Sequence, residues 1–269
     1  MKIKTCAALP MRAWRRSIGG EREMKEWKLV WSDEFDYEGL PDETKWDYQV
    51  GGSGWGNQEA QYYRRACPEN VWVHGGLLHI IACREDWEGN HYTSTRLISR
   101  EGAQWTGGRF EIRARLPKGR GTWPAIWMMP RKRGHGPWPD CGEIDIMEHV
   151  GYDPDRVHGT IHTGAFNHRK GTQKTAVHVG GNVSETFHTY ALEWEEHRLR
   201  FFMDGACYME YVPEEHCGTV TAAEWPFDED FYLILNIAVG GLWGGAQGID
   251  DSVFPQEMQV EYVRVYQRG

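Results

Sequence analysis

The chain has 269 residues, of which 40% are hydrophobic, so it can bury one substantial core. All-β sandwiches of this length often form a single domain, and we expect one domain here. The formal net charge of −9 disfavours nucleic acid and anionic membrane surfaces as partners, and no apolar run is long enough to span a bilayer. A neutral polysaccharide is compatible with this charge.

Residues 1–24 mix basic residues and glycines without periodicity, and we predict a disordered extension ahead of a domain at 25–269. The apolar run near Cys6 is too short for the h-region of a signal peptide. As written, the chain is therefore expected inside the cell, unless it leaves by another route or starts at Met24. Six cysteines without close spacing predict mostly buried thiols, with pairing of some of them as the alternative.

Alternating apolar and polar residues predict a succession of short strands. The domain is expected to begin with a strand at 27–31, and residues 231–239 form a nearly continuous apolar run that indicates a central strand covered on both faces. Turn formers such as Asp204-Gly205 mark hairpins between strands. The other predicted strands are 71–73, 77–82, 92–98, 105–116, 157–163, 189–194, 198–203 and 260–266.

Three acids alternate with apolar residues in the middle of the chain. Strict alternation on a strand places Glu143 and Asp145 on one face, whereas Glu148 would point into the core. An unpaired carboxylate there is costly. One extra residue at Ile146-Met147 would turn Glu148 back to the other two acids, so we predict a β-bulge at this point.

This arrangement predicts a pair of catalytic carboxylates. With the bulge, the Cα atoms of Glu143 and Glu148 lie roughly 13 Å apart, and side chains that lean inward bring the carboxyl groups to about the 5–5.5 Å of a retaining glycosidase. Three acids so close cannot all ionise, so at least one pKa must rise, as a general acid requires. The alternative is a solvated edge strand that happens to be acidic.

An imidazole is expected beside the acids. Turn formers at 151–156 predict an antiparallel hairpin between the acidic strand and the strand at 157–163, which places His162 opposite Glu143. His158 and His162 could also be ordinary strand residues, or a metal pair at same-face spacing. No other ligand cluster is expected to point at them, so we predict no metal site.

The acidic segment and the segments on either side of it resemble a known family. The acidic segment 143–148, with Trp-Pro-Ala-Ile-Trp at 123–127 before it and His-Gly-Thr-Ile-His at 158–162 after it, resembles the signature of glycoside hydrolase family 16. The bulged form is similar to the laminarinase-like (endo-β-1,3-glucanase) branch, and the resemblance runs from about 27 to 267. It implies a β-jelly-roll sandwich of two antiparallel sheets, with a substrate cleft on the concave face.

The resemblance also implies roles for individual residues. Glu143 is the expected nucleophile and Glu148 the general acid/base, while Asp145 holds and tunes the pair. His162 is expected to bind substrate beside them.

Further substrate-binding residues come from the same match. Trp123 and Trp127 are spaced to share a strand face and are expected in the cleft, and Asn57 matches a loop at its non-reducing side. Arg96 is expected to bond a sugar hydroxyl, with an exposed salt bridge as the alternative. Trp243 is a further candidate platform for a sugar ring.

The resemblance implies no required cofactor. Relatives can bind a structural calcium near residues 32–35 with an acid close to the C-terminus, where this chain has Glu261 in place of the usual Asp. The longer side chain alters the reach to the coordination distance of about 2.3–2.6 Å, so calcium is left open. Relatives are usually secreted, and the missing signal peptide is a departure from that pattern.

We therefore predict a monomeric, endo-acting β-1,3-glucanase that works by double displacement on a polysaccharide. Mixed-linkage β-glucan is one alternative substrate, although lichenase motifs are usually one residue shorter. Sulfated galactans are another, and their charge suits a −9 protein poorly. A non-catalytic glucan-recognition protein is the alternative from a different class. Such proteins typically lose one or both glutamates, which this chain keeps.

Overall fold

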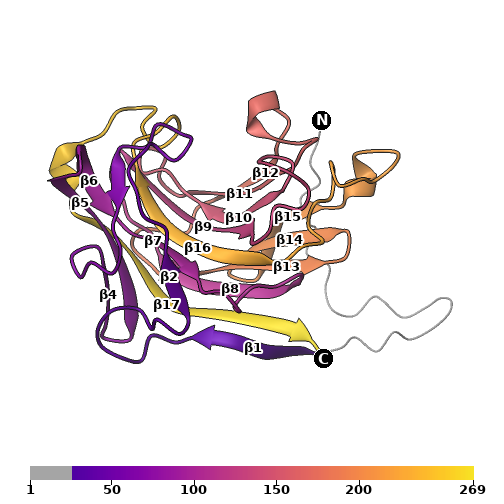
Figure 1. Cartoon of the computed structure of the whole chain (residues 1–269), viewed down its shortest axis with the longest axis horizontal. Helices are drawn as coiled ribbons and strands as arrows, with labels where there is room; N and C mark the ends of the chain where they lie inside the picture. Colours follow the sequence, from indigo (N-terminus) through magenta and orange to yellow (C-terminus); the bar gives the residue numbers. More distant parts are fainter. Residues whose placement is uncertain (1–25) are drawn as a thin grey trace.

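The computed structural model describes residues 26–269 and is built almost wholly from β-strands (Figure 1). The extension predicted at 1–24 lies outside the described residues. The strands are β1 (Trp27–Asp33), β2 (Trp46–Tyr48), β3 (Gln61–Tyr63), β4 (Val71–His74), β5 (Leu77–Trp87), β6 (Asn90–Ser94), β7 (Arg96–Ser99), β8 (Gly108–Arg115), β9 (Thr122–Pro130), β10 (Glu143–Glu148), β11 (Arg156–His162), β12 (Lys174–Val179), β13 (His188–Glu195), β14 (Arg198–Met203), β15 (Ala206–Tyr211), β16 (Phe231–Val239) and β17 (Gln256–Arg268). The short 3-10 helices are η1 (His168–Lys170), η2 (Pro213–Glu215) and η3 (Asp251–Val253).

The strands form two sheets, as expected for a jelly-roll sandwich. The larger sheet has ten strands in the order β15-β14-β13-β8-β17-β5-β6-β3, with β1 paired to β17 and β4 to β5. The smaller sheet has seven strands in the order β12-β11-β10-β9-β16-β7-β2. Pairing is antiparallel except between β3 and β6, which run parallel. The fold class predicted from the sequence is confirmed.

The core lies between the two sheets. Every second residue of β8, including Phe110 and Ile112, is buried, and the inward residues of the smaller sheet include Ile126 and Ile144. All nine residues of β16 are buried, which confirms the central strand predicted at 231–239. Because one face of the smaller sheet packs on the larger sheet, its other face is left for the acids. Figure 1 shows β16 bending along its length, so this face is curved.

The strand predicted at 92–98 is two strands. The chain breaks at the fully buried Thr95, with β6 beside β5 and β7 in the smaller sheet beside β16. A period of two cannot reveal this crossing, because residues 92–95 are buried without alternation and Arg96 is only partly exposed. The strands β2, β3 and β12 were not predicted either. Each is short or lies at the edge of its sheet.

Two further expectations concern cysteines and membranes. Among the five cysteines at positions 26–269, no two are joined to each other by a disulfide. Cys67 and Cys141 are buried, whereas the other three are only partly buried. The prediction that most of the thiols are buried was therefore wrong. Within residues 26–269, no helix has the length and hydropathy of a membrane span.

Candidate active site

Strand β10 carries the predicted bulge. Asp145 pairs with Thr160 of β11, while Glu148 pairs with His158, so three steps along β10 oppose two along β11. The pairing of β10 with β9 shifts in the same interval, between Asp145 and Met147. The extra residue restores the parity of Glu148 with the two earlier acids, as predicted.

The bulge is held from the core side. Ile146 and Met147 are fully buried, and the hydroxyl of Tyr208 on β15 donates a hydrogen bond to the Ile146 carbonyl at 3.3 Å. A Cβ atom at Gly159 would lie 2.7 Å from that hydroxyl oxygen, so glycine is needed where Tyr208 passes β11. The carbonyl that the bulge removes from regular pairing therefore has a donor.

The three acids open into a cleft of about 380 Å³ on the outer face of the smaller sheet. Its walls combine aromatic rings with amide and charged groups, the composition expected for a site that binds sugar rings and their hydroxyls. The lining residues are Gln49, Trp55, Gly56, Asn57, Glu59, Tyr63, Arg96, Trp123, Ala125, Trp127, Met129, Arg133, Trp138, Glu143, Asp145, Glu148, His168, Arg169, Tyr232, Asn236 and Ala238.

Each glutamate accepts a hydrogen bond from a different indole. Trp138 Nε1 donates to Glu143 Oε2 at 2.8 Å, and Trp123 Nε1 donates to Glu148 Oε1 at 3.0 Å. The two carboxylates are therefore held at opposite ends of β10 by separate side chains. A hydrogen bond to the charged form of a carboxylate lowers its pKa, so each indole opposes the effect of burial.

Burial raises the pKa of all three acids. The pKa of Glu143 rises to about 7, opposed by hydrogen bonds from Trp138 and Asp145. The pKa of Glu148 rises to about 8, through burial and then the charge of Glu143. The pKa of Asp145 is also raised well above its usual value, by burial and then by the charges of Glu143 and Glu148. Burial and mutual repulsion thus favour the protonated forms within this group of acids.

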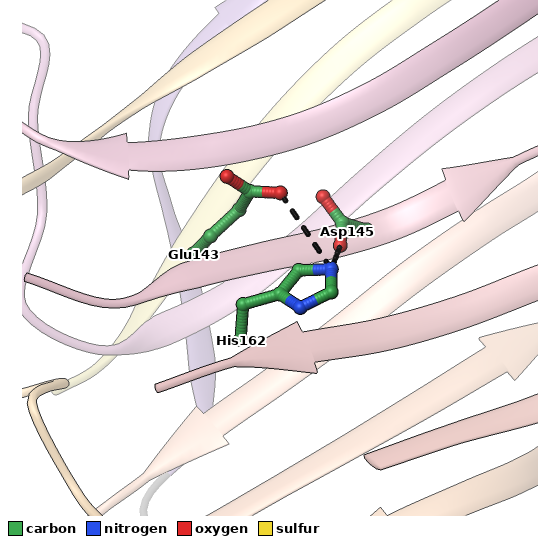
Figure 2. A group of neighbouring side chains, drawn as sticks. All are labelled: Glu143, Asp145 and His162. Atoms are coloured by element: carbon green, nitrogen blue, oxygen red, sulfur yellow. Dashed lines mark ion pairs between the residues drawn. The ribbon is translucent and has the colours of Figure 1, made fainter. Parts of the chain in front are cut away.

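His162 lies beside Glu143 and Asp145, as Figure 2 shows. Its Nε2 is 3.5 Å from Asp145 Oδ2 and 3.9 Å from Glu143 Oε1. Burial and the nearby His168 lower the pKa of His162 to about 3, so the imidazole is neutral at neutral pH. The predicted pairing of His162 with Glu143 across the hairpin is confirmed.

These three residues also form a group that can offer ligands to a metal. One atom from each of Glu143, Asp145 and His162 lies within 4.8 Å of the others. The group consists of the imidazole and two of the acids that were predicted to lie side by side. His158 is not part of this group, so the pair of histidines considered from the sequence does not form a shared site.

Arg96 and Trp127 lie in the cleft as predicted. The Arg96 guanidinium carbon is 4.6 Å from the ring centre of Trp55 and 4.5 Å from that of Trp127. Trp127 Nε1 also donates to Asn236 Oδ1 at 2.7 Å. Arg96 is thus held between two aromatic rings and lines the cleft. This arrangement differs from the exposed salt bridge considered from the sequence.

The other predicted binding residues divide into two groups. Asn57 and Trp123 line the cleft. Trp243 and His162 do not, and His162 is buried beside the acids. The Trp243 ring packs edge-on against Trp123 at 5.4 Å and against His158 at 4.9 Å, so it supports the wall of the cleft.

Several lining residues were missed from the sequence. Trp138 lies in the loop before β10, and Trp55 in the glycine-rich loop before β3, where no period places a side chain. Asn236 lies in the apolar run of β16, and an amide in such a run was the one available signal. His168 and Arg169 come from η1, after β11. These residues are far apart in the sequence and come together only when the chain is folded.

The carboxylates considered for calcium have cationic partners. Glu261 pairs with Arg113, and Glu34 accepts two hydrogen bonds from Arg264, at 3.0 and 2.8 Å. Guanidinium groups occupy the oxygens that a hard cation would need. The residues present therefore do not fit a calcium site built on Glu261.

The chain is similar to known proteins in both sequence and structure. Residues 73–264 match the sequence profile of the glycosyl hydrolases family 16. The chain is 56% identical to a beta-glucanase of Rhodothermus marinus over 255 residues, which cover 93% of this chain and 89% of that protein. The crystal structure of the laminarinase from Rhodothermus marinus superposes with a TM-score of 0.88 at 56% identity, covering 91% of this chain and 98% of that one.

A second solved structure bears on specificity. The enzyme SCLam, described as a non-specific endo-beta-1,3(4)-glucanase from family GH16, matches with a TM-score of 0.84 and 46% identity, covering 90% of this chain and 92% of that one. The match to the family profile spans more than half of the chain, and the identity to the R. marinus protein extends over nearly all of it. The chain belongs to glycosyl hydrolases family 16.

Proposed function

We propose that this protein is an endo-acting β-1,3-glucanase that hydrolyses laminarin-type glucan with retention of configuration. The observation that carries the proposal is the bulged strand β10, which turns Glu143, Asp145 and Glu148 into one aromatic cleft. The similarity to a beta-glucanase and to a laminarinase over nearly the whole chain supports the choice of substrate.

Glu143 is the nucleophile in this proposal and Glu148 is the general acid. Hydrogen bonds from Trp138 and Asp145 favour the charged form of Glu143, which can attack the anomeric carbon. Glu148 keeps its proton to higher pH and gives it to the leaving glycosidic oxygen as the bond to the anomeric carbon breaks. In the second step Glu148 removes a proton from water, and that water displaces Glu143 from the glycosyl-enzyme.

Asp145 acts on the nucleophile without touching the anomeric carbon. Its own pKa is strongly raised, and its side chain donates a hydrogen bond to Glu143 that favours the charged form of Glu143. A protonated Asp145 therefore spares Glu143 a neighbouring charge while it helps to hold the carboxylate. The neutral His162 packs beside both acids and adds no charge to the site.

The remaining cleft residues bind the sugar chain. Arg96, fixed between Trp55 and Trp127, presents a guanidinium to hydroxyl groups, and the rings offer flat apolar surfaces to pyranose C–H faces. Asn57 adds an amide on the same side. No step requires a cofactor, because the two glutamates supply the nucleophile and the proton.

Product analysis on three polysaccharides tests the proposal. Purified protein incubated with laminarin, mixed-linkage β-glucan and agarose is expected to release short β-1,3 oligosaccharides from laminarin and less product from mixed-linkage glucan. Glu143→Gln should lower turnover by several orders of magnitude while sugar binding persists, because the amide keeps the shape but cannot attack. Binding without cleavage by the unmodified protein would instead indicate a glucan-recognition protein, and cleavage of agarose alone would refute the substrate.

Mixed-linkage β-glucan is the second candidate substrate. It is favoured by the similarity to SCLam, whose description as a β-1,3(4)-glucanase covers both linkages. The same incubation separates the two candidates. Equal rates on laminarin and on mixed-linkage glucan would support the broader specificity.

A further inference from the structure

We propose that the outer face of the edge strand β12, formed by Thr175, Val177 and Val179, binds the glucan chain beyond the carboxylates. These three residues are called the β12 shelf below. The shelf would receive the sugars that lie on the opposite side of the scissile bond from Trp55 and Arg96. This inference rests on the proposed function, since its ligand is a β-glucan chain.

An endo-acting enzyme needs chain contacts on both sides of the bond that it cleaves. The strands that line the cleft are β10 and those on one side of it, namely β9, β16 and β7. On the other side only β11 and β12 remain before the sheet ends, as Figure 1 shows. A chain that crosses the carboxylates must therefore continue over β11 and β12.

The pairing of the strands places the shelf on the same face as the acids. Glu148 pairs with His158 of β11, and His158 pairs with Val177 of β12. Paired residues in antiparallel strands point to the same face of the sheet. Thr175 and Val179 lie two residues to either side of Val177, so they share this face.

The neighbouring residues of β12 confirm this orientation. Ala176 packs against the core between the sheets, and the ring of His178 lies 5.9 Å from that of Tyr208 on β15. Both side chains therefore point toward the other sheet. On the opposite face, Thr175 Oγ1 lies 3.0 Å from Thr160 Oγ1, which belongs to the row of Asp145.

The chemistry of the shelf suits a neutral sugar chain. Val177 is 38% exposed and Val179 is 63% exposed, so both present apolar surface to the solvent. Methyl groups can pack against pyranose C–H surfaces, and the Thr175 hydroxyl can bond a sugar hydroxyl. No acid, lysine or arginine stands between 175 and 179. With strands about 4.8 Å apart, β12 lies roughly 10 Å from β10, about the length of two sugar rings.

The shelf should therefore strengthen binding only of chains long enough to reach it. Chains short enough to occupy only the Trp55 side of the cleft would gain no affinity from the shelf. Replacement of a valine methyl by a hydroxyl is expected to weaken binding of the longer chains by about fourfold for each valine. Threonine keeps the β-branched shape that a strand favours, so the fold should be retained.

The test measures binding by calorimetry in the Glu143→Gln background, which avoids turnover. The probes are β-1,3-gluco-oligosaccharides from the disaccharide to the octasaccharide. Val177→Thr with Val179→Thr should weaken the longest chains by about sixteenfold and leave the shortest unchanged. Val179→Tyr should strengthen only the longest chains, since it adds an aromatic surface at an exposed position. The matched control is Val30→Thr on β1 of the other sheet, where the valine is 49% exposed.

The outcomes separate this inference from the proposed function. Unchanged binding of every chain length in the double variant would overturn the shelf and leave the proposed function standing. Equal weakening of short and long chains would also overturn it, because that pattern reports a general change of the cleft. If the parent protein bound none of the oligosaccharides, both the proposed function and the shelf would fail.

Discussion

The two glutamates differ in their surroundings more than in their sequence context. Glu143 accepts hydrogen bonds from Trp138 and Asp145, whereas Glu148 accepts one from Trp123 and lies near the charge of Glu143. The environment therefore separates two chemically identical groups into a nucleophile and an acid. This separation follows from burial and from which indole each carboxylate meets.

The pH dependence should report both carboxylates. The rate constant kcat/KM is expected to rise as Glu143 loses its proton near pH 7 and to fall as Glu148 loses its proton near pH 8. Trp123→Phe removes the hydrogen bond that lowers the pKa of Glu148, so the alkaline limb should move to higher pH. Trp138→Phe should move the acid limb instead, also to higher pH.

The pH profiles of kcat/KM for the two variants check this assignment. Each variant serves as the control for the other, since both lose an indole N–H from the same cleft. Movement of the same limb in both variants, or of neither limb, would contradict the separate roles of the glutamates.

At the scale of single residues, much of the candidate site could be predicted. Alternation in the acidic segment required a bulge, and spacing placed Trp123 and Trp127 on one face. The position of the Trp243 ring could not be predicted in this way. Its loop lies close to the acids, but its ring packs against Trp123 and His158, and only the packed fold decides between these positions.

Among the elements, the bulge in β10 is the feature on which the site depends. Tyr208→Phe removes the hydroxyl that bonds the Ile146 carbonyl, so the free energy of unfolding should fall by about 1–2 kcal/mol. Urea unfolding of the variant measures this change. Tyr190→Phe is a matched control, because that hydroxyl is buried without a hydrogen-bond partner. Equal losses in both variants would show that the bulge carbonyl gains nothing from Tyr208.

Not every element could be predicted. Long, strongly patterned strands such as β8 and β16 were found from their alternation or their continuous apolar run. The edge strand β12 was missed, because its residues are mostly half-exposed and carry no clear period. The break at Thr95 was missed because the chain changes sheets at a fully buried residue. Edges and crossings depend on tertiary packing, which a local pattern does not record.

For the whole molecule, the net charge of −9 and a neutral substrate make a prediction about salt. A neutral glucan feels little long-range field, so kcat/KM on laminarin should change less than about twofold between 50 and 500 mM salt. Carboxymethylated glucan is the control, because its charges should make the rate depend on salt. A strong salt dependence on laminarin would indicate that charge, rather than shape and hydroxyl contacts, governs binding.

The architecture as a whole was predictable from composition, turn signals and the acidic segment. The sequence could not supply the order of strands that brings Trp55, Arg96 and Asn236 together from three distant segments. Arg96 and Asn236 meet where β7 and β16 pair in the smaller sheet, and Trp55 reaches Arg96 from the glycine-rich loop before β3.

The most direct test of the retaining mechanism is the anomeric configuration of the first product released from laminarin. Proton NMR during early hydrolysis measures this configuration. Double displacement through Glu143 predicts that the β-anomer appears first and converts slowly to the α-anomer by mutarotation. Initial release of the α-anomer would contradict a covalent intermediate on Glu143 and would require the two glutamates to act as the acid and base of an inverting enzyme.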